Sequence, residues 1–148
     1  MNAGPVRILL VDDETSILDS LGILLRGEGY QVVAANGGRE AMEALSREKP
    51  DLVVTDIRMP GATGLDVLTR SRELDPEVPV ILMTAQASLQ SAVRAVNEGA
   101  YYYLQKPFSN DELLAICRRA FEARELKEEN RILRKEIRQR DRDDPARP

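Results

Sequence analysis

The stretch Leu52-Val53-Val54-Thr55-Asp56 combines an apolar, β-branched run with a carboxylate at its end. Such a run is typical of a buried strand, so the pattern places Asp56 at the carboxyl end of that strand. Open sheets of parallel strands bind ligands in the crevice beyond those ends. A turn residue or a helix N-cap is the commoner role of an Asp after a strand, so Asp56 alone does not establish a site.

The rest of the chain repeats this unit. Five short apolar runs alternate with five helix-like segments, which predicts an α/β fold whose parallel sheet is covered on both faces. The last helix is expected to start at Ser109, with Glu112 completing a capping box. The expected strands are residues 6–11, 30–35, 52–56, 80–84 and 101–105, and the first four helices are expected at residues 15–27, 39–49, 65–74 and 88–97.

Composition limits the function classes. A chain of 148 residues with 43% hydrophobic residues supports one core plus an appendage. The formal net charge of -4 gives no reason to expect binding of nucleic acid or an acidic membrane. The absence of histidine excludes His-based catalysis and His-ligated metals, and the single Cys117 excludes an internal disulfide. With no membrane-spanning or signal pattern, a cytoplasmic location is expected.

Polar side chains follow four of the five expected strands: Asp12 and Asp13, Asp56, Thr84 and Lys106. In a doubly wound sheet of order 2-1-3-4-5, the first and third strands are neighbours, so the three acids would share one crevice. Carboxylates packed together repel unless a proton or a cation neutralises one of them. Oxygen ligands with water in the remaining positions suit Mg²⁺, so the sequence predicts a magnesium site there.

Lys106 and Thr84 extend this site toward phosphate chemistry. An acid cluster with its metal ion, a lysine and a hydroxyl group are the parts needed to bind a phosphoryl group and make it electrophilic. Asp56 would then be the nucleophile that forms an aspartyl phosphate, with Asp12 and Asp13 as metal holders. Each residue singly has a plainer explanation, as a charge near a helix N-terminus or a solvated surface lysine. Their convergence at one sheet edge favours the phosphate site.

Four motifs occur in order along the chain, around the ends of the expected strands. They are Val11-Asp12-Asp13-Glu14, Val54-Thr55-Asp56-Ile57-Arg58-Met59-Pro60-Gly61, Met83-Thr84-Ala85 and Tyr103-Leu104-Gln105-Lys106-Pro107-Phe108. With these motifs the chain resembles, over about residues 6–122, the receiver domains of bacterial two-component response regulators, which implies a flavodoxin-like fold. The resemblance implies that Asp56 receives phosphate from a phosphohistidine on a separate sensor histidine kinase.

The resemblance also assigns roles within the site. It implies that Asp13 and Asp56 ligate Mg²⁺ directly, that Asp12 acts through water, and that the backbone carbonyl of Arg58 is a further ligand. It implies a cis peptide bond before Pro107, which would aim Lys106 at the phosphate. Activity of this kind is signalling phospho-acceptance: the domain would catalyse only its own phosphotransfer and dephosphorylation.

The resemblance also implies a route for the signal. Phosphorylation adds nearly two negative charges at Asp56, Thr84 moves to bond the phosphate, and Tyr103 turns inward to fill the space. The altered surface would comprise the fourth helix, fifth strand and fifth helix, which the family uses for partner or self-association, so a homodimer is expected. Tyr101 and Tyr102 are interpreted as ordinary strand aromatics.

The last helix could run for about thirty residues, because no Gly or Pro occurs between Ser109 and Pro145. Its second half carries a heptad pattern, predicting that residues 123–148 form a coiled-coil linker with a disordered end from Gln139, next to a receiver domain at residues 1–122. Arg119 and Arg140 fall at d positions, so a solvated helix or frayed linker stays open. The seam has Ile116, Ala123, Asn130 and Ile137 at a and Leu126 and Leu133 at d.

The segment Gly99-Ala100-Tyr101-Tyr102-Tyr103-Leu104 and the Asn130-containing helix are most similar to receivers of sigma-54-dependent, nitrogen-regulatory type transcriptional activators. That implies a fragment lacking the ATPase and DNA-binding domains, which itself binds no nucleic acid and no membrane. A stand-alone receiver is the alternative.

Two other function classes are alternatives to the receiver. A haloacid-dehalogenase type phosphatase also uses an Asp nucleophile, but Arg58 stands where its second acid belongs. Flavin binding would need a phosphate-cradling loop after the first strand, where acids stand instead.

Overall fold

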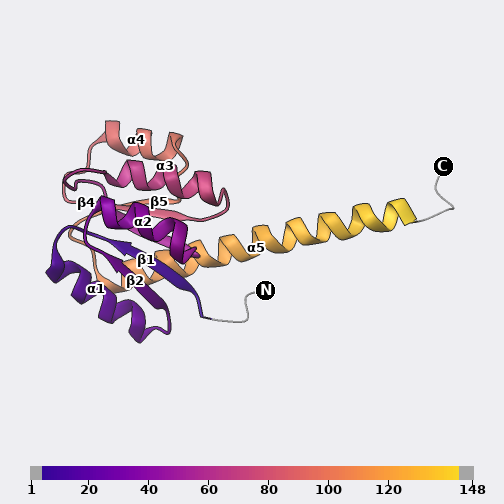
Figure 1. Ribbon diagram of the computed structural model, residues 1–148, viewed down its shortest axis with the longest axis horizontal. Helices are drawn as coiled ribbons and strands as arrows, with labels where there is room; N and C mark the ends of the chain where they lie inside the picture. Colours follow the sequence, from indigo (N-terminus) through magenta and orange to yellow (C-terminus); the bar gives the residue numbers. More distant parts are fainter. Residues whose placement is uncertain (1–4, 144–148) are drawn as a thin grey trace.

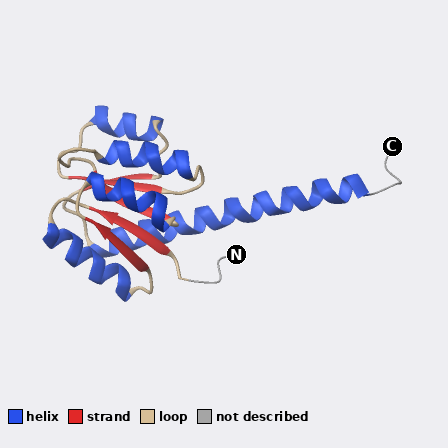
Figure 2. Ribbon diagram, viewed as in Figure 1, coloured by secondary structure: helices blue, strands red, loops and turns tan. Residues whose placement is uncertain are grey.

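A computed structural model describes residues 5–143 of the chain. Five parallel strands form one sheet in the order β2-β1-β3-β4-β5, so the predicted fold class is confirmed (Figures 1 and 2). The strands are β1 (Arg7–Val11), β2 (Gln31–Ala35), β3 (Leu52–Asp56), β4 (Val80–Thr84) and β5 (Tyr102–Gln105). The helices are α1 (Thr15–Gly27), α2 (Gly38–Glu48), α3 (Gly64–Leu74), α4 (Leu89–Asn97) and α5 (Asn110–Asp143).

Burial follows the order of the strands. Every residue of β3 and β4 is buried, whereas the edge strands β2 and β5 have exposed positions. Side chains of a strand alternate between faces, so Leu10 packs with residues of α1 and α5, while Leu9 and Val11 pack with residues of α2, α3 and α4. Figure 1 shows these helices arranged around the sheet. The sheet is therefore covered on both faces, and its central strands end among helices and loops on one edge.

Helix α5 belongs to the domain at its start and leaves it at its end (Figure 1). The hydroxyl of Ser109 accepts a hydrogen bond from the backbone N–H of Glu112, so Ser109 caps the helix as predicted. Leu113, Cys117 and Ala120 are buried in the core, and Ala120 is the last buried residue among the helix side chains that the structure describes. Burial raises the pKa of the Cys117 thiol to about 12, which suits a core residue rather than a reactive one.

Two predictions about this helix are corrected. Ile116, predicted as the first residue of the dimer seam, is 6% exposed and lies in the core, so the exposed part of the seam starts beyond it. The disordered end predicted from Gln139 is helical through Asp143, because no helix breaker intervenes. Residues 144–148 of that predicted end lie outside the described residues.

Within residues 5–143, no helix is both long and apolar enough to cross a bilayer.

Candidate functional site

The candidate site lies where β1, β3 and β5 end, because all strands of the sheet run in parallel and deliver their final residues to one edge. The carboxylates of Asp12, Asp13 and Asp56 each place an oxygen atom within 4.8 Å of the others. Asp12 and Asp56 are 0% and 7% exposed, whereas Asp13 is exposed. The predicted cluster of three acids is thus brought together, with one side open to solvent.

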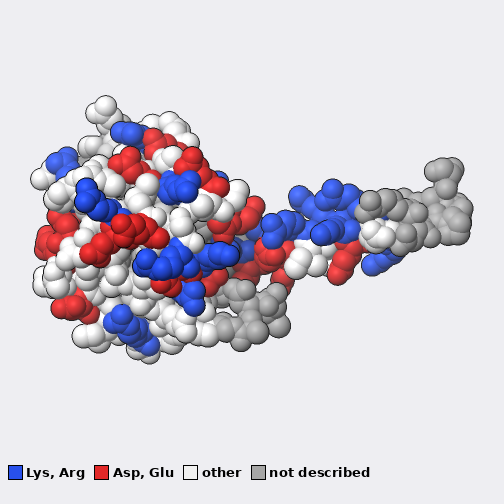
Figure 3. Space-filling view, in the orientation of Figure 1, with Lys and Arg blue, Asp and Glu red and all other residues white. Residues whose placement is uncertain are grey.

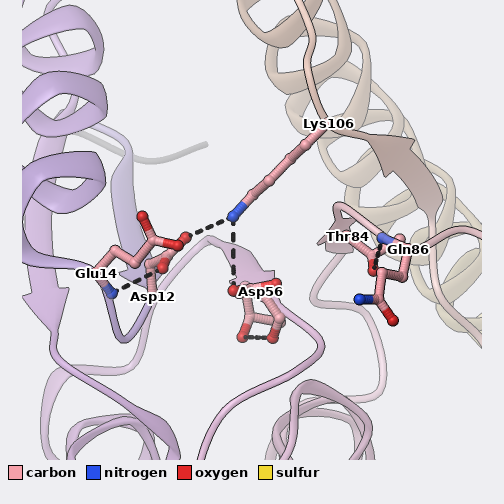
Figure 4. Close-up of polar contacts among 7 residues, drawn as sticks. Asp12, Glu14, Asp56, Thr84, Gln86 and Lys106 are labelled. Carbon is pink, nitrogen blue, oxygen red and sulfur yellow. Dashed lines mark hydrogen bonds and ion pairs between the residues drawn. The ribbon is translucent and has the colours of Figure 1, made fainter.

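Lys106 extends from the end of β5 between two of these acids (Figure 4). Its Nζ atom lies 3.0 Å from Oδ2 of Asp12 and 3.5 Å from Oδ2 of Asp56. The backbone N–H of Lys106 donates to the carbonyl of Thr84, and the peptide bond to Pro107 is cis, as the resemblance implied. The ammonium group therefore bridges the two buried carboxylates, and Asp12 holds it most closely.

Burial and neighbouring charges shift the pKa values of Asp56 and Lys106. Burial raises the pKa of Asp56 above its ordinary value, the charge of Lys106 opposes that rise, and the charge of Asp12 adds to it. Burial lowers the pKa of Lys106, but its hydrogen bond with Asp12 and the charges of Asp12 and Asp56 outweigh this, so the net pKa is raised. The lysine is thus charged at neutral pH and offsets only part of the carboxylate charge.

The acid cluster has the chemistry of a hard-cation site. Three carboxylates face one ammonium group, so the cluster carries excess negative charge, and Asp13 is open to solvent. Oxygen ligands on one open side match a divalent ion that keeps several water molecules, as Mg²⁺ does. Arg58, predicted to add its backbone carbonyl, lies exposed in the loop after β3. The residues present therefore fit the predicted ion.

The loop from β3 to α3 closes against the site through backbone contacts. The backbone N–H of Ile57 donates to the carbonyl of Met83, and the N–H of Gly64 donates to the carbonyl of Ile57. At the start of α3, Thr63 and Asp66 form a capping box. The carboxyl end of β3, and with it Asp56, is therefore anchored on both sides.

Thr84 and Tyr103 lie near the site but bond elsewhere. The buried hydroxyl of Thr84 accepts a hydrogen bond from the backbone N–H of Gln86 at 3.1 Å (Figure 4). The hydroxyl of Tyr103 pairs with the hydroxyl of Ser91, in the first turn of α4, at 2.6 Å. Thr84 is thus tied to the loop that follows β4, and Tyr103 to the first turn of α4. Sequence reasoning missed Ser91, because nothing in its own surroundings marks it as the partner of a strand residue.

Comparison with known proteins agrees with this geometry. The family model described as response regulator receiver domain matches residues 8–118. DNA-binding transcriptional regulator NtrC of Escherichia coli (strain K12) is 42% identical over 113 residues, which are 76% of this chain and 24% of that protein. C4-dicarboxylate transport transcriptional regulatory protein DctD of Pseudomonas aeruginosa is 41% identical over 128 residues, which are 86% of this chain and 28% of that protein.

Solved structures show the same similarity. A response regulator receiver domain protein (CheY-like) from Methanospirillum hungatei JF-1 superposes with a TM-score of 0.81 at 34% identity, covering 84% of this chain and 99% of that one. The chain spans about a quarter of the length of NtrC and DctD. The predicted similarity to receivers of sigma-54-dependent activators is confirmed by relatives such as these, and the phosphatase alternative is not favoured. Receivers of this kind are signalling phospho-acceptors that histidine kinases phosphorylate. By its sequence, its sheet topology and its matched region, the chain belongs to the response regulator receiver domain family.

Proposed function

We propose that Asp56 is the phospho-acceptor of this receiver and takes a phosphoryl group from a phosphohistidine of a sensor histidine kinase. The convergence of Asp12, Asp13, Asp56 and Lys106 at one sheet edge carries the proposal. No histidine occurs in the chain, so the donor imidazole is not part of the receiver domain itself. The domain itself supplies the acceptor and the charges around it.

Asp13 and Asp56 would hold Mg²⁺ directly, with Asp12 acting through water and the carbonyl of Arg58 as a further ligand. When bound, the ion offsets negative charge on the phosphoryl oxygens and the carboxylates. A carboxylate oxygen of Asp56 forms the new bond to phosphorus. The bond from phosphorus to the imidazole nitrogen breaks, and its electron pair stays on that nitrogen. Lys106 and the hydroxyl of Thr84 stabilise the charge that spreads over the phosphoryl oxygens.

The test is incubation of the protein with Mg²⁺ and a small phosphodonor such as acetyl phosphate, followed by intact-mass measurement. We expect the mass of one phosphoryl group to be added and Asp56→Asn to abolish the addition, because the amide is a poor nucleophile. Asp51→Asn, on the loop before β3, serves as a matched control that should leave incorporation intact. Incorporation that persists in Asp56→Asn, or sustained phosphate release from many phosphoesters, would contradict the proposal.

We further propose that Thr84 and Tyr103 transmit the phosphorylated state to α4. The Thr84 hydroxyl would leave Gln86 to donate to a phosphoryl oxygen, and Tyr103 would leave Ser91 to fill the vacated space. Both bonds that hold the start of α4 to the switch residues are broken by this movement. The new charge-assisted hydrogen bond from Thr84 to the phosphoryl group would therefore favour one of two arrangements of Thr84, Tyr103 and the start of α4.

Ser91→Ala and Tyr103→Phe test this switch. Each removes the same neutral hydrogen bond, whose net worth of about 1 kcal/mol corresponds to a roughly fivefold population shift. We expect backbone amide NMR signals of the segment between β4 and α4 to move toward their phosphorylated positions in both variants. The double variant should equal either single variant, and Tyr102→Phe, at an exposed neighbour, should change nothing. Additive shifts in the double variant would count against the switch.

We also propose that the chain forms a homodimer through the end of α5 and through the surface of α4, β5 and α5. Leu126, Leu133 and Ile137 are 59%, 53% and 52% exposed, although all three are large and apolar. They lie on one side of the helix together with Asn130, which favours a parallel pair in one register. On α4, Leu89, Val93 and Val96 are exposed as well, so an apolar surface of the domain adjoins β5.

A double substitution Leu126→Glu and Leu133→Glu tests the seam. It should weaken dimerisation by about tenfold or more, because like charges would meet at the d positions of a parallel pair. Lys135→Glu is the control, because Lys135 is exposed and lies on the opposite side of the helix from the seam. Analytical ultracentrifugation of both variants, and of a chain ending at Ala123, measures the effect. The proposed seam would be wrong if the double variant, the control variant and the shortened chain all weakened dimerisation equally, or if none of them weakened it.

The output of the whole protein extends this proposal. The relatives named above are transcriptional regulators by name, and this chain spans only a part of each. We infer that phosphorylation and dimerisation control an effector, an ATPase and DNA-binding portion of a sigma-54-dependent activator, joined through α5. A stand-alone receiver is the alternative. A cytoplasmic location remains a prediction from the sequence.

A further inference from the structure

We infer that an ion pair between Asp75 and Arg124 sets the direction in which α5 leaves the domain, and thereby which side of the helix faces a second chain. The side that faces a second chain rests on the proposed dimer, whereas the direction of the helix does not. Arg124 stands four residues after Ala120, the last buried residue among the side chains of α5 that the structure describes. The pair thus acts where the core no longer holds the helix.

The geometry of the pair joins two distant parts of the chain. Nη2 of Arg124 donates to Oδ2 of Asp75 at 2.8 Å, across 49 residues of sequence. Asp75 is the C-cap of α3, and its Oδ1 atom accepts from the backbone N–H of Glu77 at 3.0 Å. One carboxylate therefore both shapes the turn between α3 and β4 and holds α5 against that turn.

Few other contacts surround the ion pair of Arg124 with Asp75 at the point where α5 leaves the domain. Arg124 reaches into a hollow of about 430 Å³ beside the ends of α2 and α3, and it lines two further hollows of about 350 and 260 Å³ along α5. Its Nη1 atom is buried and has no hydrogen-bond partner in the described part of the chain. Glu77 and Lys127 line one of these hollows with it, and Figure 3 shows that charges of both signs continue along α5. Apolar packing here is incomplete, so the charge contact has a correspondingly larger share in fixing the helix.

The position of Arg124 on the helix orients the seam. At 3.6 residues per turn, Leu126, Leu133 and Ile137 lie about 180–220° around the axis from Arg124. With Arg124 held against the domain, the apolar seam faces away from it. Ile137 lies about 20 Å further along the axis, so a tilt of about 10° at Arg124 would displace it by about 3 Å. A small change at the pair becomes a large change at the seam.

The experiment measures the direction of α5 without dimerisation. Spin labels on cysteines at exposed Arg39 of α2 and exposed Lys135 of α5 report their distance distribution in the full chain, and buried Cys117 does not compete for the label. The Leu126→Glu and Leu133→Glu background weakens the proposed dimer, and the labelled protein is measured at a concentration at which ultracentrifugation shows a monomer, so failure of this inference is distinguishable from failure of the dimer proposal. Asp75→Asn removes the charge while its amide oxygen still accepts from Glu77, and Arg124→Met keeps an apolar stem.

Either substitution should lower the ratio of docked to undocked helices by roughly two- to fivefold, the range for a partly exposed ion pair. The double variant should match the single variants, and 1 M NaCl should reproduce the change in the parent protein. Arg70→Met, which breaks the exposed pair with Glu73 inside α3, should leave the distribution unchanged. An unchanged distribution in Asp75→Asn, or an effect of Arg124→Met alone, would overturn the inference.

Discussion

Lys106→Met is expected to slow phosphate incorporation by a small phosphodonor by about 10²–10³-fold, the usual effect of removing one preorganised charge from an anionic transition state. Lys106 is positioned for this because its Nζ atom lies 3.5 Å from Asp56, the residue proposed to form the bond to phosphorus. The rate is followed by intact mass against time at saturating Mg²⁺. Lys127→Met removes an exposed lysine of α5 and should leave the rate unchanged.

The same variant separates folding from chemistry. Removing the ammonium group leaves the buried carboxylates of Asp12 and Asp56 without their cation, at a cost of about 3 kcal/mol in the free energy of unfolding. Because a raised carboxyl pKa means that the folded state holds its proton more tightly, the stability of Lys106→Met should fall as pH rises through and above the ordinary carboxyl range. The deficit relative to the parent should therefore be largest at neutral pH and smallest in acid.

Mg²⁺ should restore much of that stability, since it supplies cationic charge to the same cluster, but it should not restore the rate. Urea unfolding with and without Mg²⁺ at several pH values tests this. A variant that regains both stability and rate on adding Mg²⁺ would show that Lys106 serves the fold alone. A stability deficit, relative to the parent, that is the same at every pH would show that Lys106 does not balance the carboxylates.

Gly64→Ala should destabilise the domain by about 3 kcal/mol or more, through overpacking of a site that cannot relax cheaply. A Cβ atom at Gly64 would lie 2.2 Å from the carbonyl oxygen of Asp56 and 2.7 Å from the Cα of Ile57. Both neighbours are backbone atoms, one in the last residue of β3 and one in the residue after it, and every residue of β3 is buried. Relief would require α3 or the end of β3 to shift, which would displace Asp56.

Urea unfolding measures the loss, and phosphate incorporation under folded conditions measures the displacement of Asp56. Gly27→Ala is the matched control, because a Cβ atom there meets nothing within 4 Å. Alanine at that helical position should be neutral or stabilising by up to about 1 kcal/mol. Comparable stability of the Gly64→Ala and Gly27→Ala variants would show that the start of α3 is free to move.

Much of the fold follows from local pattern. The strand edges were predictable to within one residue, because apolar runs of strand length stop at Gly, Pro and polar residues. The candidate site was predictable because parallel topology brings strand ends together whatever the loops do, so Asp12, Asp56 and Lys106 meet by necessity of the sheet. The distances within the site could not be predicted from the sequence. That Lys106 lies closer to Asp12 than to Asp56 depends on how the side chains are placed.

Contacts between distant segments lay beyond pattern reasoning. The bond between Ser91 and Tyr103 and the pair of Asp75 with Arg124 join residues whose own neighbourhoods are unremarkable. Ile116 was assigned to the seam because heptad spacing and the spacing of a core-facing helix coincide over a short stretch. Only the position of the sheet distinguishes the two, and it places Ile116 in the core.

Because α5 is one continuous helix, its exposed half needs no nucleation of its own (Figure 1). A free peptide of that length would pay to form its first turn, whereas this segment only propagates turns that the folded core has already set. Its helical phase is therefore inherited from the domain. One residue inserted after Ala123 would rotate everything beyond it by about 100°, while seven would restore the face to within about 20°. The length of this linker is thus constrained to steps of a heptad wherever two chains must meet.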